Sequence, residues 1–217
     1  MTSREDILGR VRSHLGRNDD NAKPAAAGID AWLTARTQGP RPTVSGDLVA
    51  RFRDWSEKQS STVDTVATLA EAPAAIARYL AAMQLVAQAM CWPQLGGLPW
   101  REAGLEVALR GAVDADLVGI TGCFCAVAET GTLVLLSGRD TPATASLLPE
   151  THIAIVPASR IVPGMEDAWD LIRAEHGELP RAVNFVSGPS RTGDIEQTIV
   201  LGAHGPYRVH IVIVADN

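Results

Sequence analysis

The sequence of 217 residues has few aromatic side chains, only two lysines and a net charge of −6. It contains no run of basic residues, and nucleic-acid binding needs a clustered positive surface, so we expect no nucleic-acid partner. No apolar stretch approaches the roughly 18 to 20 residues that a membrane span requires. Glu5 and Asp6 stand close to Met1, where a secretory signal would lead into its apolar segment. We therefore expect a cytoplasmic protein without a membrane span.

Cysteine is also scarce, with Cys91, Cys123 and Cys125 as the three examples. An odd number of cysteines without a signal segment is typical of a reducing compartment. The single residue between Cys123 and Cys125 is not the spacing of a zinc knuckle or thioredoxin motif, and the sequence has no four-cysteine iron–sulfur motif. The histidines show no helical metal-binding spacing either. We expect buried thiols, no metal site and no cofactor.

The remaining composition is that of one globular domain with a small extension, since 46% of the residues are hydrophobic and 20% are charged. Seventeen of the 19 basic residues are arginines. Arginine is the better ligand for phosphates and carboxylates. The arginines are scattered along the chain, however, and a coding bias that also enriches alanine accounts for most of them.

The first 60 residues predict a helical arm and linker. An apolar stripe and the capping residue Ser3 indicate a helix over 3–16, with Ile7, Leu8, Val11 and Leu15 on one face. The polar and Ala/Pro-rich stretch 17–28 reads as a linker, followed by a short helix over 29–36 and another helix from Asp47. The apolar stripe can pack on the core of its own chain, form a homodimer or dock a partner protein.

Residues 61–217 predict an α/β domain with a mixed, mostly parallel sheet that helices cover on both faces. Strands that are apolar on both faces alternate here with helices, which is typical of such a sheet. We expect strands at 63–69, 105–109, 116–121, 126–128, 131–136, 152–156, 183–186 and 209–214, and helices at 73–90, 164–176 and 192–201. Ligands of such sheets bind beyond the carboxyl ends of the strands, so the loops that follow strands are the candidate site.

The first candidate segment is 119–132, in which Glu129 stands among small and apolar residues. A buried acid is costly without partners, so Glu129 is a candidate catalytic nucleophile, general base or acceptor for ligand hydroxyls. The alternative is that it caps backbone amides in a turn. Neighbouring residues would line a ligand site, namely Thr121, Gly122, Thr130 and Gly131.

The second candidate segment is 187–196, where a strand runs into a Gly-Pro turn and a predicted helix start. Hydroxyls, backbone amides and a guanidinium converge there, which suits a carboxylate or phosphate. The candidate ligand-binding residues are Ser190, Arg191, Thr192, Asp194 and Glu196. The alternative is a capping network with an internal ion pair.

The third candidate segment is 202–206, where Gly202 ends the predicted helix and a histidine stands two residues later. His204 and Gly205 are candidate ligand-binding residues, since the glycines leave His204 either exposed or directed into a pocket. His210 lies within the final predicted strand, and we interpret it as structural.

These three segments, in this order and spacing, resemble the lactate utilisation protein C family, also called the LUD domain. The residues that carry the resemblance are Ala126–Thr132, Gly188–Thr192 with Asp194–Glu196, and Gly202 with His204–Pro206. Phe124 departs from the family pattern, which has an acid shortly before the Ala-x-Ala-Glu run. The resemblance implies a fold like that of sugar-phosphate isomerases and CoA transferases. It further implies a component of L-lactate oxidation to pyruvate that acts beside two iron–sulfur partner proteins.

Three functions follow from these observations. The first is an accessory subunit of a lactate-oxidising system that binds a small anionic ligand. The second is an acyltransferase-like or isomerase-like enzyme, because Glu129-Thr130-Gly131 is similar to the segment in CoA transferases whose glutamate is the nucleophile. The third is a non-catalytic interaction module that docks through its helical arm.

Overall fold

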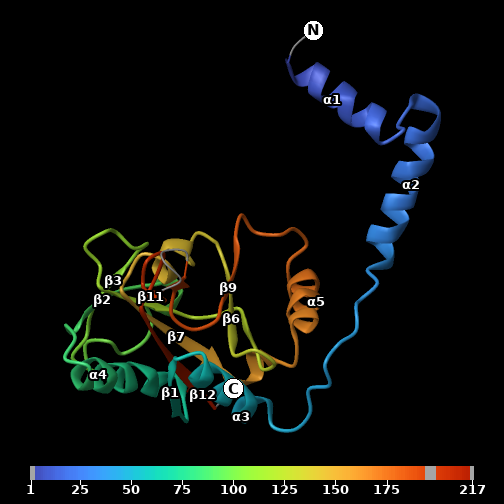
Figure 1. Cartoon of the computed structure of the whole chain (residues 1–217). Coiled ribbons are helices and arrows are strands. Elements are labelled where there is room, and N and C mark those ends of the chain that lie inside the picture. The colour runs from blue at the N-terminus through green and yellow to red at the C-terminus, as the bar shows by residue number, and fades with distance from the viewer. Residues whose placement is uncertain (1–2, 194–198, 216–217) are drawn as a thin grey trace. The chain divides into compact units, whose positions relative to one another are not determined.

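The computed structural model describes residues 3–193 and 199–215, and the chain divides into two units, Met1–Thr43 and Val44–Asn217 (Figure 1). The first unit contains helix α1 (Ser3–His14) and helix α2 (Asp19–Ala35). Acidic residues in the first turn of α1 and basic residues in its last turn complement the helix dipole. The predicted first helix is therefore confirmed.

The predicted linker over 17–28 is wrong, because most of that segment is the first part of α2. Asn18 and Asn21 form a reciprocal capping box, in which each side chain accepts the other residue's backbone N–H at 2.9 and 3.0 Å. The alanines that follow are the strongest helix formers, and together with this cap they outweigh the helix-breaking effect of Pro24.

Both helices of this first unit present apolar side chains to solvent. None of the described residues of α1 is buried. The exposed large apolar side chains of α1 and α2, and of the turn between them, are Ile7, Val11, Leu15, Ile29, Trp32 and Leu33. In neither helix do the described residues form a buried core.

The second unit is built on a six-stranded sheet whose strands are all parallel. Their order is β1 (Thr62–Val66), β12 (Arg208–Val214), β7 (Thr151–Pro157), β4 (Val118–Thr121), β2 (Gln88–Cys91) and β3 (Glu106–Leu109). The central strands are buried on both faces, which explains their nearly continuous apolar sequences. The predicted mainly parallel α/β fold is confirmed.

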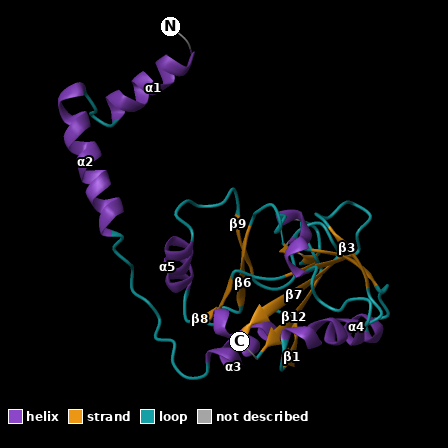
Figure 2. Ribbon diagram, turned by 180° about the vertical axis from the view of Figure 1, so that it is seen from behind, coloured by secondary structure: helices purple, strands orange, loops and turns teal. Residues whose placement is uncertain are grey.

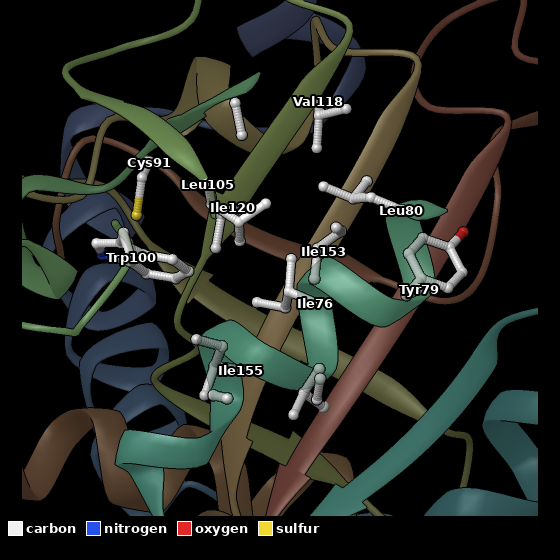
Figure 3. Packing of buried hydrophobic residues seen from close by; sticks show 14 of the residues in the cluster. Ile76, Tyr79, Leu80, Cys91, Trp100, Leu105, Val118, Ile120, Ile153 and Ile155 are labelled. Atoms are coloured by element: carbon white, nitrogen blue, oxygen red, sulfur yellow. The ribbon is translucent and has the colours of Figure 1, made fainter. Parts of the chain in front are cut away.

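One face of this sheet is covered by helix α4 (Ala72–Ala82), whose residues Ile76 and Leu80 pack on the sheet residues Ile153 and Ile155 (Figure 3). The other face is covered by helix α3 (Leu48–Lys58) and a smaller sheet. That sheet has the order β8 (Ile161–Val162), β5 (Cys125–Val127), β6 (Thr132–Leu136) and β9 (Val183–Val186). Helix α5 (Met165–Glu175) packs on the smaller sheet (Figure 2). Short 3-10 turns complete the unit, namely η1 (Leu69–Glu71), η2 (Pro93–Leu95), η3 (Ala143–Ser146) and η4 (Ala158–Arg160).

The starts of these helices follow local rules that the sequence displays. The Asp47 carboxylate accepts the backbone N–H groups of Val49 and Ala50, so the predicted helix start at Asp47 is confirmed. Pro73 lies in the first turn of α4, where its missing N–H costs nothing. Asp167 accepts the backbone N–H of Gly164 at the start of α5.

Two predicted helices are wrong in extent or type. The helix predicted over 73–90 ends at Ala82, because Gln84 adopts a left-handed conformation and β2 begins at Gln88. The helix predicted over 192–201 is replaced at its two ends by β10 (Arg191–Thr192) and β11 (Val200–Leu201), which pair antiparallel. Residues 194–198, which include Asp194 and Glu196, lie outside the described residues.

The order of the strands creates a switch point between β4 and β2. From β2 the chain moves outward to β3, whereas from β4 it moves the other way, to β7. The carboxyl ends of β2 and β4, at Cys91 and Thr121, are therefore adjacent, and the segments that follow them diverge. Crevices at such points are the usual ligand sites of parallel sheets.

Among the described residues, no helix combines the length and apolarity that crossing a bilayer requires.

Candidate functional site

A cavity of about 350 Å³ lies directly beyond this switch point. Trp92 follows β2, and Cys123 and Phe124 follow β4, so both strands deliver side chains to its wall. The other lining residues come from the end of β6, the 3-10 turns η2 and η4, the loop after β6 and the C-terminal end of α5, namely Gln94, Leu136, Thr141, Arg160, Glu175 and His176. Its volume falls within the range of about 300–1,000 Å³ that small-molecule sites occupy.

Arg160, which ends η4 just after β7, is the fixed cation of this cavity. Its Nε donates to the carbonyl oxygen of Phe124 at 2.7 Å, and its guanidinium lies 4.6 Å from the centre of the Phe124 ring. Its Nη1 and Nη2 donate to the two carboxylate oxygens of Glu175 at 2.7 and 3.0 Å. These bonds hold the pKa of Glu175 below its ordinary value. The cavity therefore contains a planar, oriented guanidinium paired with a carboxylate.

The aromatic walls of the cavity are also held in place. The indole N–H of the buried Trp92 donates to the carbonyl oxygen of Pro142 at 3.0 Å. The rings of His176 and Phe124 make an edge-to-face contact, with 5.4 Å between their centres. The Thr141 hydroxyl donates to the carbonyl oxygen of Leu136. The cavity wall thus combines aromatic and apolar side chains with several polar groups held in fixed orientations.

The three cysteines remain thiols in this environment. Burial raises the pKa of Cys91 to about 12 and that of Cys125 to about 11, and it also raises the pKa of Cys123, which lines the cavity. Cys91 and Cys125 are buried as predicted, and Cys123 is partly buried. Because the thiolate is the nucleophilic form, burial disfavours reaction of these cysteines at neutral pH. Within the described ranges, no group of three or more His, Cys, Asp and Glu residues is arranged to hold a metal ion.

Glu129 and its neighbours lie at the opposite end of β5 from this cavity. The Glu129 backbone N–H donates to the carbonyl oxygen of Pro163 at 3.0 Å, and the side chain is partly exposed. The hydroxyls of Thr130, Thr132 and Ser187 form a chain, with 2.7 and 2.6 Å between successive oxygens. This chain links the turn after β5 to the end of β9.

Gly131 allows this turn to approach helix α3 closely. Its φ of +66° is in the left-handed region, and a Cβ added there would lie 2.5 Å from the backbone nitrogen of Ser56. The space that a side chain would need is therefore filled by the backbone of α3. This packing accounts for the glycine without a ligand.

The second predicted segment meets the same end of α3. Gly188, with a φ of +70°, packs on the backbone of Gln59. The Arg191 Nη2 donates to the carbonyl oxygen of Gln59 at 3.0 Å and to the Ser60 hydroxyl at 2.6 Å. A cation that binds the last carbonyl groups of a helix complements its dipole. The structure thus brings Thr130, Gly131 and Arg191 together around α3, and Arg191 binds its own chain there.

The remaining predicted residues lie in two further places. The Ser190 backbone N–H donates to the carbonyl oxygen of Pro206, and Gly205 packs beside the Ser190 side chain, while His204 is exposed. Thr192 lies in β10. Thr121 is fully buried, and its hydroxyl lies 2.8 Å from Nε2 of His152.

The cavity residues were missed by sequence reasoning, although one signal pointed to them. Gly122, which was predicted, borders the Trp92 ring, and Trp92 and Phe124 follow strands as the carboxyl-end rule requires. Arg160 follows β7 in the same way. The pairing of Arg160 with Glu175, fifteen residues later, has no sequence signal.

Comparisons with known proteins agree on one family. The model of the LUD domain matches residues 49–214. Lactate utilization protein C of Bacillus subtilis (strain 168) is 42% identical over 132 residues, which cover 58% of this chain and 54% of that protein. This chain spans about half the length of several such curated relatives. Lactate utilization protein C of Exiguobacterium sp. (strain ATCC BAA-1283 / AT1b) is 34% identical, with all of this chain and 97% of that protein aligned. The crystal structure of a DUF162 family protein from Deinococcus radiodurans superimposes with a TM-score of 0.60 and 26% identity, over 80% of this chain and all of that one.

Proposed function

The chain belongs to the LUD domain family, and from this premise we propose that it is an accessory subunit in lactate utilisation, which binds a small carboxylate beside iron–sulfur partner proteins. The relatives named lactate utilization protein C support the role in lactate utilisation. The observation that carries the binding role is the cavity at the β2–β4 switch point with Arg160 in its wall. In this proposal the partners transfer electrons in the cytoplasm, and this chain supplies the carboxylate site.

The chemistry of Arg160 supports a carboxylate as the ligand. A guanidinium presents two parallel N–H groups that match the two oxygens of a carboxylate. Arg160 already makes that bidentate arrangement with Glu175, so its orientation suits a carboxylate in the cavity. Trp92, Phe124 and Leu136 provide apolar walls that reduce screening by water and strengthen the interaction.

Isothermal titration calorimetry with L-lactate and pyruvate tests this function. We expect at least one of these acids to bind the wild-type chain, and Arg160→Gln to weaken that binding by at least about tenfold, because a charge-assisted bidentate pair is lost.

Arg110→Gln is the matched control. Arg110 forms the same kind of pair with Asp116, at 2.6 and 2.8 Å, but it does not line this cavity. Its binding affinity should equal that of the wild type. Absence of binding to the wild type, or an equal loss in both variants, would contradict the proposal. In cells that lack the wild-type gene, a gene with Arg160→Gln should restore growth on L-lactate less well than a gene with Arg110→Gln.

A further inference from the structure

The two outer N–H groups of Arg160 that a ligand carboxylate would use are already bound to Glu175. We propose that Glu175 is an internal competitor, and that a ligand carboxylate binds by taking its place on the guanidinium. This inference rests on the proposed function and adds the mode and selectivity of binding. In this proposal Glu175 determines which anions bind in the cavity.

Arg160 keeps its position when Glu175 leaves, because two further contacts hold it. Its Nε donates to the carbonyl oxygen of Phe124, and its guanidinium stacks on the Phe124 ring. Both contacts are made by Phe124, which lies in the segment between β4 and β5, and neither involves the Glu175 carboxylate. The guanidinium is therefore preorganised to accept a second carboxylate in the same orientation.

Glu175 is the more easily displaced member of the pair. It is the last residue of α5, where a negative charge is disfavoured by the exposed carbonyl ends of the helix. Its side chain is 41% exposed, compared with 29% for Arg160. A carboxylate at such a position can turn into solvent without being buried unpaired.

The exchange favours a ligand that carries a single negative charge. When a monocarboxylate replaces Glu175, the guanidinium keeps one negative partner, so its charge balance does not change. A phosphate or dicarboxylate would add a second negative charge beside the displaced Glu175 and against the apolar walls, which is unfavourable. Gln94 lines the same cavity and offers a side-chain amide to an oxygen next to the carboxylate, and the Thr141 hydroxyl oxygen, whose proton is donated to Leu136, can accept a hydrogen bond from a ligand hydroxyl. The ligand class is therefore small 2-hydroxy or 2-oxo monocarboxylic acids.

Calorimetric titration of L-lactate, pyruvate and inorganic phosphate into four chains tests the exchange. The chains are wild type, Glu175→Gln, Arg160→Gln with Glu175→Gln, and the control Asp116→Asn, which removes the carboxylate of the equivalent pair outside the cavity. We expect Glu175→Gln to bind the acid about three- to tenfold more tightly than wild type, because the competitor has lost its charge. We expect the double variant to lose this binding, and Asp116→Asn to match wild type.

Phosphate gives a second measurement that does not depend on the absolute affinity. In wild type the monocarboxylate should bind more tightly than phosphate, and Glu175→Gln should reduce that preference because the cavity then carries a net positive charge. Thermal unfolding of each variant verifies that it is folded.

The outcomes separate the two proposals. If wild type binds the acid and Glu175→Gln binds it equally or more weakly, Glu175 orients Arg160 rather than competes with the ligand, and the exchange is wrong while the proposed function stands. If wild type binds neither acid, the proposed function fails and the exchange fails with it.

Discussion

Arg160 and Arg191 lie in two polar regions of the same unit, and their surroundings differ in kind. Arg191 lies in the segment with the densest sequence signal, yet its guanidinium binds Gln59 and Ser60 at the end of α3. Arg160 stands in a sequence without a recognisable pattern, yet it lies in the wall of a cavity at the strand switch point. The comparison shows that glycines, hydroxyls and an arginine in one short segment can all be required by the packing of the chain on itself.

The same distinction applies to the glycines and hydroxyls of the two regions. Gly131 and Gly188 admit the backbone of α3, and the Thr130–Thr132–Ser187 chain joins two strands of the smaller sheet. Around Arg160, in contrast, the side chains enclose a space. We therefore expect changes near α3 to reduce stability and changes near Arg160 to reduce ligand binding.

The largest expected effect is acid destabilisation through two buried histidines. Burial lowers the pKa of His152, the partner of Thr121, and of His210 to about 4. The unfolded chain binds these protons near pH 6.5, so it takes up more protons than the folded chain between about pH 6.5 and 4. Stability should fall through that window by about 3 kcal/mol for each histidine. Urea unfolding at pH 7.0 and 4.5 measures the loss.

Two variants test whether the buried histidines cause this loss of stability in acid. His152→Gln should remove about half of the pH dependence, whereas His204→Gln should leave it unchanged because His204 is exposed. If the wild type is equally stable at pH 7.0 and 4.5, the stability of the fold does not depend on a neutral His152 beside Thr121, and the prediction is wrong.

The next largest effect is steric, and it tests the close approach of Gly131 to the backbone of α3. Gly131→Ala should lower the free energy of unfolding by about 2–4 kcal/mol, because the new Cβ meets the α3 backbone and the residue must also adopt a positive φ. Gly104→Ala is the control, since Gly104 has a φ of +77° but open space around it, and it should cost about 1 kcal/mol. Equal costs in urea unfolding would mean that the approach to α3 contributes nothing.

The smallest effect distinguishes the two arginines directly. Arg191→Gln should cost about 0.5–1 kcal/mol of stability, because an exposed hydrogen bond to the end of α3 is lost, and should leave carboxylate affinity unchanged. If Arg191→Gln loses as much carboxylate affinity as Arg160→Gln does, the ligand site lies at α3. The roles that we assign to the two arginines would then be wrong.

The regular part of the fold was predictable from local sequence. The strands β7 and β12 are apolar on both faces, and Asp47 and Pro73 mark helix starts by their own chemistry. The pattern over 83–90 predicts a continued helix, because a short apolar run does not distinguish a helix from a buried strand. The left-handed residue Gln84, which ends α4, carries no such signal.

The candidate site was less predictable because it depends on strand order. Thr121 and Gly122 were predicted as neighbours of Glu129, and Gly122 borders the cavity residue Trp92. The cavity itself exists because β2 and β4 are neighbours although β3 separates them in sequence. The Arg160–Glu175 pair depends on how α5 packs against the smaller sheet, which is a tertiary property.

The position of β12 has a consequence for how the protein is made. β12 is the last of the six sheet strands to leave the ribosome, yet it lies between β1, the first of them, and β7. Until it is synthesised, β1 has no neighbour in the sheet, and β7 presents an open, apolar edge. Such edges pair readily with other chains. During synthesis this edge is therefore unpaired from the completion of β7 at Pro157 until β12 follows at Arg208, and the sheet can be completed only then.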